Sequence, residues 1–201
     1  NAVYAIELLD DGKILVGGNF TTFNGNSQRY LIRLNEDGTK DTSFIPYQNN
    51  ELNLTFTTED AIFDFAVTSD KIYVVTQYLR RLNYDGSIDN SFTVGYSDIH
   101  SIAIQENGKI LVGGDFTQFN DVAENRLIRL NTDGSKDTSF NTGIGFNNNA
   151  VYAIELLDDG KILVGGQFIS YNGDNSSAFL IALHTEQSLS SNSFNLDKTV
   201  V

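Results

Sequence analysis

The chain alternates short apolar runs with polar turns at regular intervals. An apolar run over Val3–Leu9 is followed by the turn residues Asp10-Asp11-Gly12 and by a second apolar run over Lys13–Gly18. This pattern predicts two β-strands joined by a tight hairpin. Ile14-Leu15-Val16 is apolar at successive positions, as in a strand that is covered on both faces. No window follows the i, i+3, i+4, i+7 pattern of an amphipathic helix, so the chain is predicted to be all-β.

A second block follows in the same unit and has the same design. It places the β-prone stretch Tyr30–Asn35 before the turn residues Glu36-Asp37-Gly38, and the stretch Thr39–Phe44 after them. Two hairpins in succession predict four antiparallel strands in a meander, named A to D in chain order. In such a meander we expect the A–B and C–D turns at one end of the sheet and the B–C and D–A connections at the other.

Both blocks recur along the chain. Residues 1–18 are repeated without change at residues 149–166, and the glycines of the second block, Gly38, Gly86 and Gly134, are evenly spaced. Such internal repetition predicts a repeat architecture. We therefore expect one repeat domain, residues 1–201, whose four units lie at approximately 1–46, 47–95, 96–147 and 148–201.

A single four-stranded sheet of this size cannot cover both of its own faces. Stacking such sheets around an axis covers them, which is the construction of a β-propeller. A twisted sandwich is the alternative, but a repeat period of about fifty residues favours blades. The predicted fold is an all-β, β-propeller-type array of four-stranded antiparallel blades.

The repeated motifs resemble a known family. The pattern DGKILVGG-x-F, an aromatic-Asn-Gly loop and RLN-x-DG-S-x-D-x-SF is similar to the delta-60 repeat family of bacterial β-propeller proteins. The resemblance covers nearly the whole chain and is weakest in the second unit. It implies a propeller-type repeat of large secreted or surface-attached bacterial proteins, with no catalytic residues to transfer. Because propellers of that family usually need more than four blades, it also implies an arc of a larger ring.

Composition narrows the function classes. The 26 acidic and 13 basic side chains give a net charge of −13, which disfavours nucleic acid and anionic membranes as partners. With no cysteine, a disulfide framework, a thiolate zinc site and a thiol nucleophile are excluded. No apolar run is long enough to cross a bilayer, so no membrane insertion is expected. The chain also has no methionine, and we expect it to be part of a longer polypeptide or a larger assembly.

The segment Asn35–Asp41 resembles a calcium loop, because oxygen ligands alternate and a glycine follows. The segment recurs at Asn83–Asp89 and Asn131–Asp137. However, an arginine stands two residues before the first asparagine of each copy and would lie near the ion. If Glu36-Asp37-Gly38 forms the hairpin loop, Arg33 instead faces Asp41 across the strands, and this pairing is the favoured interpretation. No metal ligands or cofactor are therefore assigned. The same count pairs Arg81 with Asp89 and Arg129 with Asp137.

The other polar candidates are weak. His100 falls in a repeated aromatic position shared with Tyr4, Phe63 and Tyr152, so a packed ring is favoured over a catalytic base. Paired carboxylates such as Asp10-Asp11 could serve glycoside hydrolysis, but acids at hairpin tips usually supply turn chemistry and solubility. We expect no enzyme activity.

The units differ most in their B–C connections, residues 21–30, 117–126 and 169–178, whereas the second unit has almost none. The first D–A connection, Ile45–Asp60, is also expanded. Variable loops on a constant frame often bind ligands. Each long B–C loop places an aromatic residue beside an amide, which suits sugar or peptide contacts; the alternative is a ring packed against its own blade beside an Asn-Gly turn. The predicted ligand residues are Phe23, Asn24, Phe119, Asn120, Tyr171 and Asn172.

Together these features predict a non-enzymatic, extracellular or cell-surface scaffold of bacterial origin for binding or adhesion. Its partner would be a protein or glycan at a cell surface. One alternative is a structural spacer in a bacterial surface fibre or a phage virion. Another is a glycan-processing enzyme, but its strand-A candidates Glu7, Asp64 and Glu155 do not repeat in a persuasive pattern.

Overall fold

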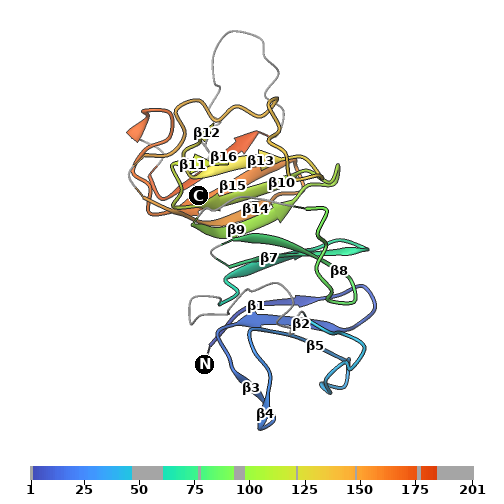
Figure 1. The fold of residues 1–201 in the computed structure, drawn as a ribbon. Helices are drawn as coiled ribbons and strands as arrows, with labels where there is room; N and C mark the ends of the chain where they lie inside the picture. Colours follow the sequence, from blue (N-terminus) through green and yellow to red (C-terminus); the bar gives the residue numbers. More distant parts are fainter. Residues whose placement is uncertain are drawn as a thin grey trace. The chain divides into compact units, whose positions relative to one another are not determined.

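The computed structural model describes residues 2–46, 61–76, 78–92, 98–120, 122–147, 149–175 and 178–184. Within these ranges the chain consists of β-strands and connections, with no α-helix (Figure 1). The chain divides into two compact units, Asn1–His100 and Ser101–Val201. The described residues accordingly contain no helix of the length and hydropathy that a membrane span requires. The predicted all-β class is confirmed.

Four three-stranded antiparallel sheets form the frame, and each is called a blade. In every blade the first strand pairs with the second and the second with the third, as in a meander. The first unit contains blade 1, which comprises β1 (Val3–Leu8), β2 (Ile14–Gly18) and β5 (Leu31–Leu34), and blade 2, which comprises β6 (Asp64–Val67), β7 (Lys71–Val75) and β8 (Leu79–Asn83). Blade 3 comprises β9 (Ile99–Ile104), β10 (Ile110–Gly114) and β13 (Leu127–Leu130), and it lies in the second unit except for the first two residues of β9. Blade 4 of the second unit comprises β14 (Val151–Leu156), β15 (Lys161–Gly166) and β16 (Leu180–His184).

Blades 1 and 3 carry an additional short hairpin between their second and third strands, called the accessory hairpin. In blade 1, β3 (Thr22–Phe23) pairs with β4 (Asn26–Ser27). In blade 3, β11 (Gln118–Phe119) pairs with β12 (Val122–Ala123). Blade 2 has no room for one, because only residues 76–78 separate β7 from β8. The predicted difference in the B–C connections is therefore a difference in accessory hairpins.

The predicted fourth strand is reduced to a single bridge in the first three blades. The bridge in blade 1 joins Leu34 to Lys40, and blades 2 and 3 have its equivalents. Immediately afterwards Asp41 Oδ1 accepts hydrogen bonds from the backbone N–H and the hydroxyl of Ser43, over 2.9 and 2.6 Å. This local turn bends the chain away from the sheet, which ends strand D.

Blade 2 packs on the face of blade 1 within the first unit. The contact depends on Gly17 of β2, because a Cβ atom at this position would lie 2.8 Å from Ile62 and 2.9 Å from Phe65. A glycine lets these two side chains approach the sheet directly. Both belong to the core of the unit, together with Leu15, Leu31, Ile72, Val74 and Leu82.

Blade 4 packs on blade 3 in the same way within the second unit. A Cβ atom on Gly113 of β10 would lie 2.5 Å from Val151 and 2.9 Å from Ile154 of β14. The core of this unit also contains Leu111, Leu127, Phe146, Ile162, Val164 and Phe168. The second strands of blades 2 and 3 are buried at successive positions, as their continuous apolar runs predicted, whereas Val16 of β2 and Leu163 of β15 are half-buried.

Candidate functional site

A buried ion pair holds the third strand to the segment after it. In blade 1, Arg33 Nε donates to Asp41 Oδ2 over 2.8 Å, and both side chains are buried. The guanidinium also lies 4.6 Å from the ring centroid of Phe44, within cation–π range. The Nε–Oδ2 distances of the equivalent pairs are 2.9 Å for Arg81 and Asp89 and 2.7 Å for Arg129 and Asp137. All three pairings predicted from the loop count are confirmed.

A lysine that sequence reasoning missed joins each pair. Lys13 Nζ lies 3.2 Å from Asp41 Oδ2, so this oxygen faces two cations. The equivalent lysines are 3.0 Å (Lys71 to Asp89) and 2.7 Å (Lys109 to Asp137) from their carboxylates. The available signal was the lysine that follows each of the first three A–B turns.

These contacts also control the ionisation of the aspartates. Burial alone would raise the pKa of Asp41, but hydrogen bonds from Ser43, Arg33 and Lys13 outweigh it and hold the pKa well below its usual range. In Asp89 hydrogen bonds from Ser91 and Lys71 dominate and lower the pKa in the same way. Each carboxylate is therefore ionised and fully engaged, which is a structural role.

The side chains of the calcium-like turn bind one another. Asp37 Oδ1 accepts hydrogen bonds from the backbone N–H and the hydroxyl of Thr39, over 2.9 and 2.6 Å. Asn35 Nδ2 donates to the same hydroxyl over 2.9 Å. Over the described ranges, no group of three or more His, Cys, Asp or Glu residues is arranged to hold a metal ion.

The aromatic-Asn-Gly motif forms a tight hairpin turn. In blade 1, Phe23 pairs with Asn26 across the two-residue loop Asn24-Gly25, whose φ angles are 47° and 78°. Positive φ at both positions is the signature of a type I′ turn, for which Asn-Gly is the preferred sequence. Phe23 is half-buried and Asn24 is exposed, so both predicted ligand residues of blade 1 are accessible.

The predicted ligand residues of the second unit are less accessible. Phe119 is buried, with its ring centroid 6.0 Å from that of Phe116, whereas Asn120 is exposed. Tyr171 is buried 4.7 Å from Phe146, centroid to centroid. A buried ring cannot present its face to a ligand, and this corrects the expectation for Phe119 and Tyr171: each packs against its own unit.

Asn172 follows Tyr171 and supports the backbone of a neighbouring loop. Its Oδ1 accepts a hydrogen bond from the N–H of Ile144 over 2.8 Å. The amide oxygen is therefore already bound within the protein. Of the six predicted ligand residues, Phe23, Asn24 and Asn120 stay as candidates for contact with a partner. Most of the predicted D–A loop, Ile45–Asp60, lies outside the described residues.

His100 occupies the predicted aromatic row. The ring centroids of Tyr4 and Phe63 are 6.1 Å apart and stacked, and those of Phe63 and His100 are 6.2 Å apart and edge-on. The three rings thus form one row within the first unit, which accounts for an imidazole in this position without a catalytic role.

A groove lies beside each accessory hairpin. In blade 1 the hairpin folds back along the third strand, where Gln28 Nε2 donates to the carbonyl oxygen of Leu31 over 2.6 Å. This brings it beside Thr39 and Lys40 of the C–D turn, although the meander predicted opposite ends for these loops. The groove has a volume of about 390 Å³, and Lys40 Nζ donates to Gln28 Oε1 over 2.6 Å within it. Its lining residues are Phe23, Asn24, Asn26, Ser27, Gln28, Thr39 and Lys40.

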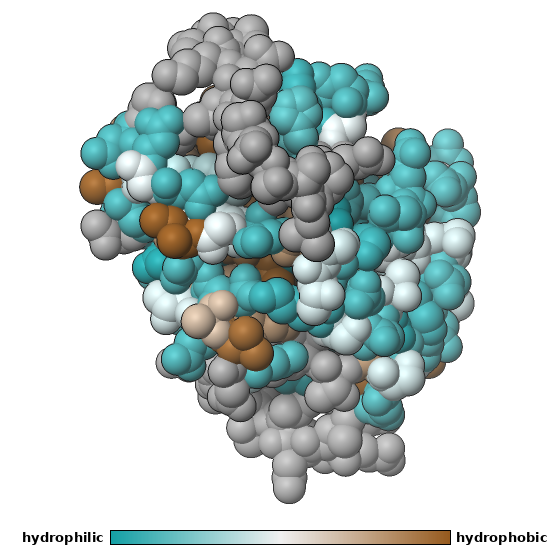
Figure 2. Space-filling model, turned by 90° about the horizontal axis from the view of Figure 1, so that it is seen from above, coloured by the Kyte–Doolittle hydropathy of each residue, from teal (hydrophilic) through white to brown (hydrophobic). Residues whose placement is uncertain are grey.

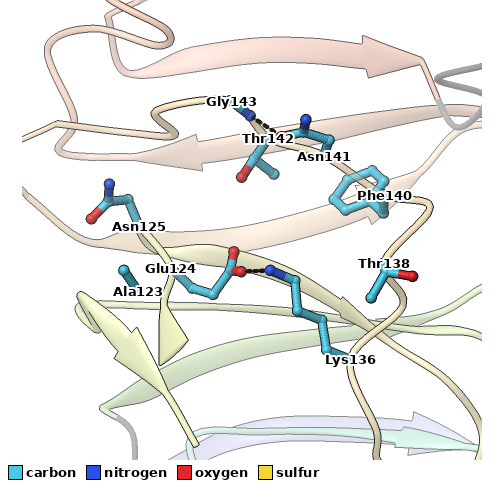
Figure 3. A pocket seen from close by; sticks show the side chains of 9 residues that line it. All are labelled: Ala123, Glu124, Asn125, Lys136, Thr138, Phe140, Asn141, Thr142 and Gly143. Carbon is cyan, nitrogen blue, oxygen red and sulfur yellow. Dashed lines mark hydrogen bonds and ion pairs between the residues drawn. The ribbon is translucent and has the colours of Figure 1, made fainter. Parts of the chain in front are cut away.

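Blade 3 has a groove of about 330 Å³ beside its accessory hairpin (Figure 3). It shares three lining positions with the groove of blade 1 and then extends along the segment after the C–D turn, whereas the groove of blade 1 extends towards the hairpin tip. Lys136 reaches from the C–D turn to the hairpin and forms an ion pair with Glu124, which is buried. Asn125 and Asn141 lie farther along the same groove. Lys136 and Glu124 correspond in the repeat to Lys40 and Gln28, so the two grooves share a lysine and differ in its acceptor.

Sequence reasoning missed both groove lysines, but the repeats contain a signal for them. The position of Lys40 and Lys136 is occupied in blade 2 by Ile88, and blade 2 has no accessory hairpin. The lysine is therefore present in those of the first three blades that have a hairpin for it to bind.

Meander blades that stack face to face through glycine contacts define the protein as a β-propeller. A sequence model of the family described as a domain of unknown function (DUF5122) beta-propeller matches residues 9–44, 70–92, 105–140 and 157–180. The chain belongs to this family. Each of the first three matched segments runs from the A–B turn of a blade to the segment after its C–D turn, whereas the match in blade 4 ends at Leu180, the first residue of β16.

Solved structures share the fold, and one of them has low sequence identity to this chain. It is the extracellular domain of a putative hybrid two-component system from B. thetaiotaomicron, with a TM-score of 0.56 and 20% identity. The similarity covers 92% of this chain and 22% of that chain, so the protein spans a small part of its length. None of the curated proteins matches the sequence.

Proposed function

We propose that the chain is a non-enzymatic binding or adhesion scaffold whose ligand contacts the accessory hairpins and their grooves. The observation that carries this proposal is the lysine-anchored hairpin that borders a groove in both blades. Both use a lysine of the C–D turn to anchor a hairpin, while the residues around the lysine differ between the copies. The buried Arg–Asp pair is present in both blades, as Arg33–Asp41 and as Arg129–Asp137. A constant frame with differing loops is the usual design of a recognition surface.

The groove chemistry suits a glycan or a polar peptide. In blade 1 the amides of Asn24 and Asn26 and the hydroxyl groups of Ser27 and Thr39 line the groove beside the half-buried ring of Phe23. Hydrogen-bonding groups that converge beside an aromatic ring can pair with hydroxyl groups and pack against an apolar ring face. The net charge of −13 disfavours nucleic acid as the partner.

We further assign the chain to the delta-60 repeat class within its family and to the outside of a bacterial cell. The repeated DGKILVGG and RLN-x-DG motifs support the first assignment. Similarity in fold to an extracellular domain supports the second. The partner is then a protein or glycan at a cell surface.

The test uses an array of neutral and acidic oligosaccharides, together with immobilised bacterial surface proteins. Lys40→Ile gives blade 1 the residue of blade 2 and removes the anchor of the hairpin. We expect this variant, and Asn24→Ala separately, to weaken binding about tenfold. Lys161→Ile, with the same charge change at the A–B turn of blade 4, should bind like the wild type. Equal binding by all variants would exclude the grooves as the ligand-binding site.

A structural spacer in a surface fibre or virion is the second candidate. The observation in its favour is the unchanged 18-residue repeat, because a spacer tolerates duplicated copies that need no individual specificity. A chain that binds no probe of either kind would support the spacer over the scaffold.

A further inference from the structure

Residues 1–18 and 149–166 have one sequence and one backbone pairing but different surroundings. In blade 1, Val3 pairs with Gly18 and Ile6 with Val16, and the register shifts between Val3 and Ala5. The copy in blade 4 repeats both pairs and the shift at the corresponding positions. Any difference in exposure between the two copies therefore reports what lies beside them.

The apolar side chains of the first strand differ sharply between the copies. Val3 and Ile6 of β1 are 51% and 65% exposed. The same residues in β14, Val151 and Ile154, are 0% and 7% exposed, because they pack on Gly113 of blade 3. Leu8 of β1 is exposed as well. We call Val3, Ile6 and Leu8 the leading face.

The tyrosine between these residues provides an internal control. Tyr4 and Tyr152 are 50% and 48% exposed, although the neighbouring apolar side chains differ strongly in exposure between the two copies. On the opposite face of the sheet the order is reversed, because Leu15 is buried in blade 1 whereas Leu163 is half-buried in blade 4. A row of exposed apolar side chains on a strand indicates a contact surface.

Blade 4 presents the complementary surface. Gly165 of β15 corresponds to Gly113, but the atoms nearest to a Cβ there are 3.8–3.9 Å away and belong to its own blade. Leu180 of β16 is 58% exposed, whereas Leu127 at the same position of blade 3 is buried. We call Gly165 and Leu180 the trailing face. Within the residues that the structure describes, no valine or isoleucine fills it as Val151 and Ile154 fill the equivalent face of blade 3.

We propose that a second copy of this chain docks head to tail, with the leading face of one copy on the trailing face of the other. Val3 and Ile6 would occupy the space above Gly165 as Val151 and Ile154 occupy the space above Gly113. The residues of the leading face are the same residues in the same backbone as those that pack on blade 3. On the trailing face Ala153 replaces Ser101, whose hydroxyl accepts a hydrogen bond from the N–H of Ile154 in the internal contact, so the apolar part of the contact is what the two faces reproduce. This contact is heterologous, because two different surfaces meet. It is independent of the ligand proposed above.

Two variants block one face each. Gly165→Val adds a side chain where the free chain has space for it, in a strand that favours β-branched residues. Ile6→Asp places a charge at the centre of the leading face. Ile45→Asp is the matched control, because Ile45 is also highly exposed but lies outside both faces.

Light scattering on a size-exclusion column measures the mass over a wide range of concentrations. We expect the wild type and Ile45→Asp to rise from 22.2 kDa to at least twice that mass. Each face variant should stay at 22.2 kDa where the wild type is assembled. Circular dichroism and the thermal midpoint confirm that the variants are folded.

Mixing the two face variants gives the decisive result. Gly165→Val keeps an intact leading face and Ile6→Asp keeps an intact trailing face, so the mixture contains one functional contact. We expect a one-to-one dimer and nothing larger. A wild type that stays at 22.2 kDa at every concentration, or a mixture that does not associate, would overturn the proposal.

Discussion

At the scale of single residues, Asp41 shows how a calcium-like sequence serves a purely structural purpose. One carboxylate oxygen faces Arg33 and Lys13, and the other accepts two hydrogen bonds from Ser43. The pairing with Arg33 could be predicted because a hairpin loop of known length fixes which residues face each other. The contact with Lys13 could not be predicted. It joins the start of the second strand to Asp41, whose position depends on where strand D ends.

Removal of the guanidinium should be costly, because it leaves a buried carboxylate with only one of its two cationic partners. We expect Arg129→Leu to lower the free energy of unfolding by about 3 kcal/mol. Arg29→Leu changes the charge equally at an exposed position and should cost less than about 0.5 kcal/mol. Urea denaturation of both variants measures the difference. Similar values for the two would show that the buried pair contributes little.

The lowered pKa values of Asp41, Asp89 and Asp137 predict a loss of stability in acid. The unfolded chain binds protons near an aspartate pKa of about 3.9, whereas the folded chain binds them only at lower pH. The free energy of unfolding should therefore hold above about pH 5 and fall progressively as the pH is lowered through 4 towards 2. Denaturation at several pH values measures this slope. Asp137→Asn should make it shallower, and an unchanged slope would contradict the assignment.

At the scale of elements, the strands, the tight turns and the repeat were predictable from periodicity and glycine. Two features were not. Strand D shrinks to a bridge because Asp41 and Ser43 form a local turn, and propensity alone does not report this competition. The accessory hairpin lies beside the C–D turn because Gln28 binds the backbone of the third strand, which is a contact between distant sequence positions.

Blade packing predicts opposite outcomes for one substitution at two equivalent glycines. A side chain at Gly113 would overlap Val151 and Ile154, so Gly113→Val should destabilise the protein by about 1–3 kcal/mol. Gly165→Val has space and should leave the monomer as stable as the wild type. Chemical denaturation at low protein concentration compares the two. Equal destabilisation would mean that strand geometry, and not blade packing, requires the glycine.

At the scale of the whole molecule, the excess of acidic side chains lies on a scaffold built from repeated blades. Hydrophilic residues predominate on the face shown in Figure 2, with hydrophobic residues in small separate groups. The net charge of the chain is −13. Arg33 and Arg129 each form an ion pair with a buried aspartate. The fold could thus be inferred from the repeat, whereas the candidate site needed the structure, which alone separates buried Phe119 and Tyr171 from accessible Phe23.

Self-repulsion of this charge predicts that salt stabilises the protein. Raising NaCl from about 10 mM to about 150 mM shortens the screening length to about 8 Å and should raise the thermal midpoint, since buried pairs are screened much less. Calorimetry at the two salt concentrations measures the shift. A falling midpoint would show that surface ion pairs dominate. CaCl₂ and MgCl₂ at equal concentration should act alike, and a larger effect of calcium would reopen the calcium-loop interpretation.

The independence of the accessory hairpin from the blade beneath it has a practical consequence. Blade 2 keeps its Arg81–Asp89 pair and its three strands without a hairpin, so a blade can form whether or not that insertion is present. The accessory hairpin can therefore be exchanged without changing the blade. One lysine of the C–D turn anchors it through a hydrogen bond or ion pair to Gln28 or Glu124. A foreign recognition loop could be grafted between the second and third strands of a blade, with a lysine in place of Ile88 to fasten it, and the array would then display several unrelated loops on one framework.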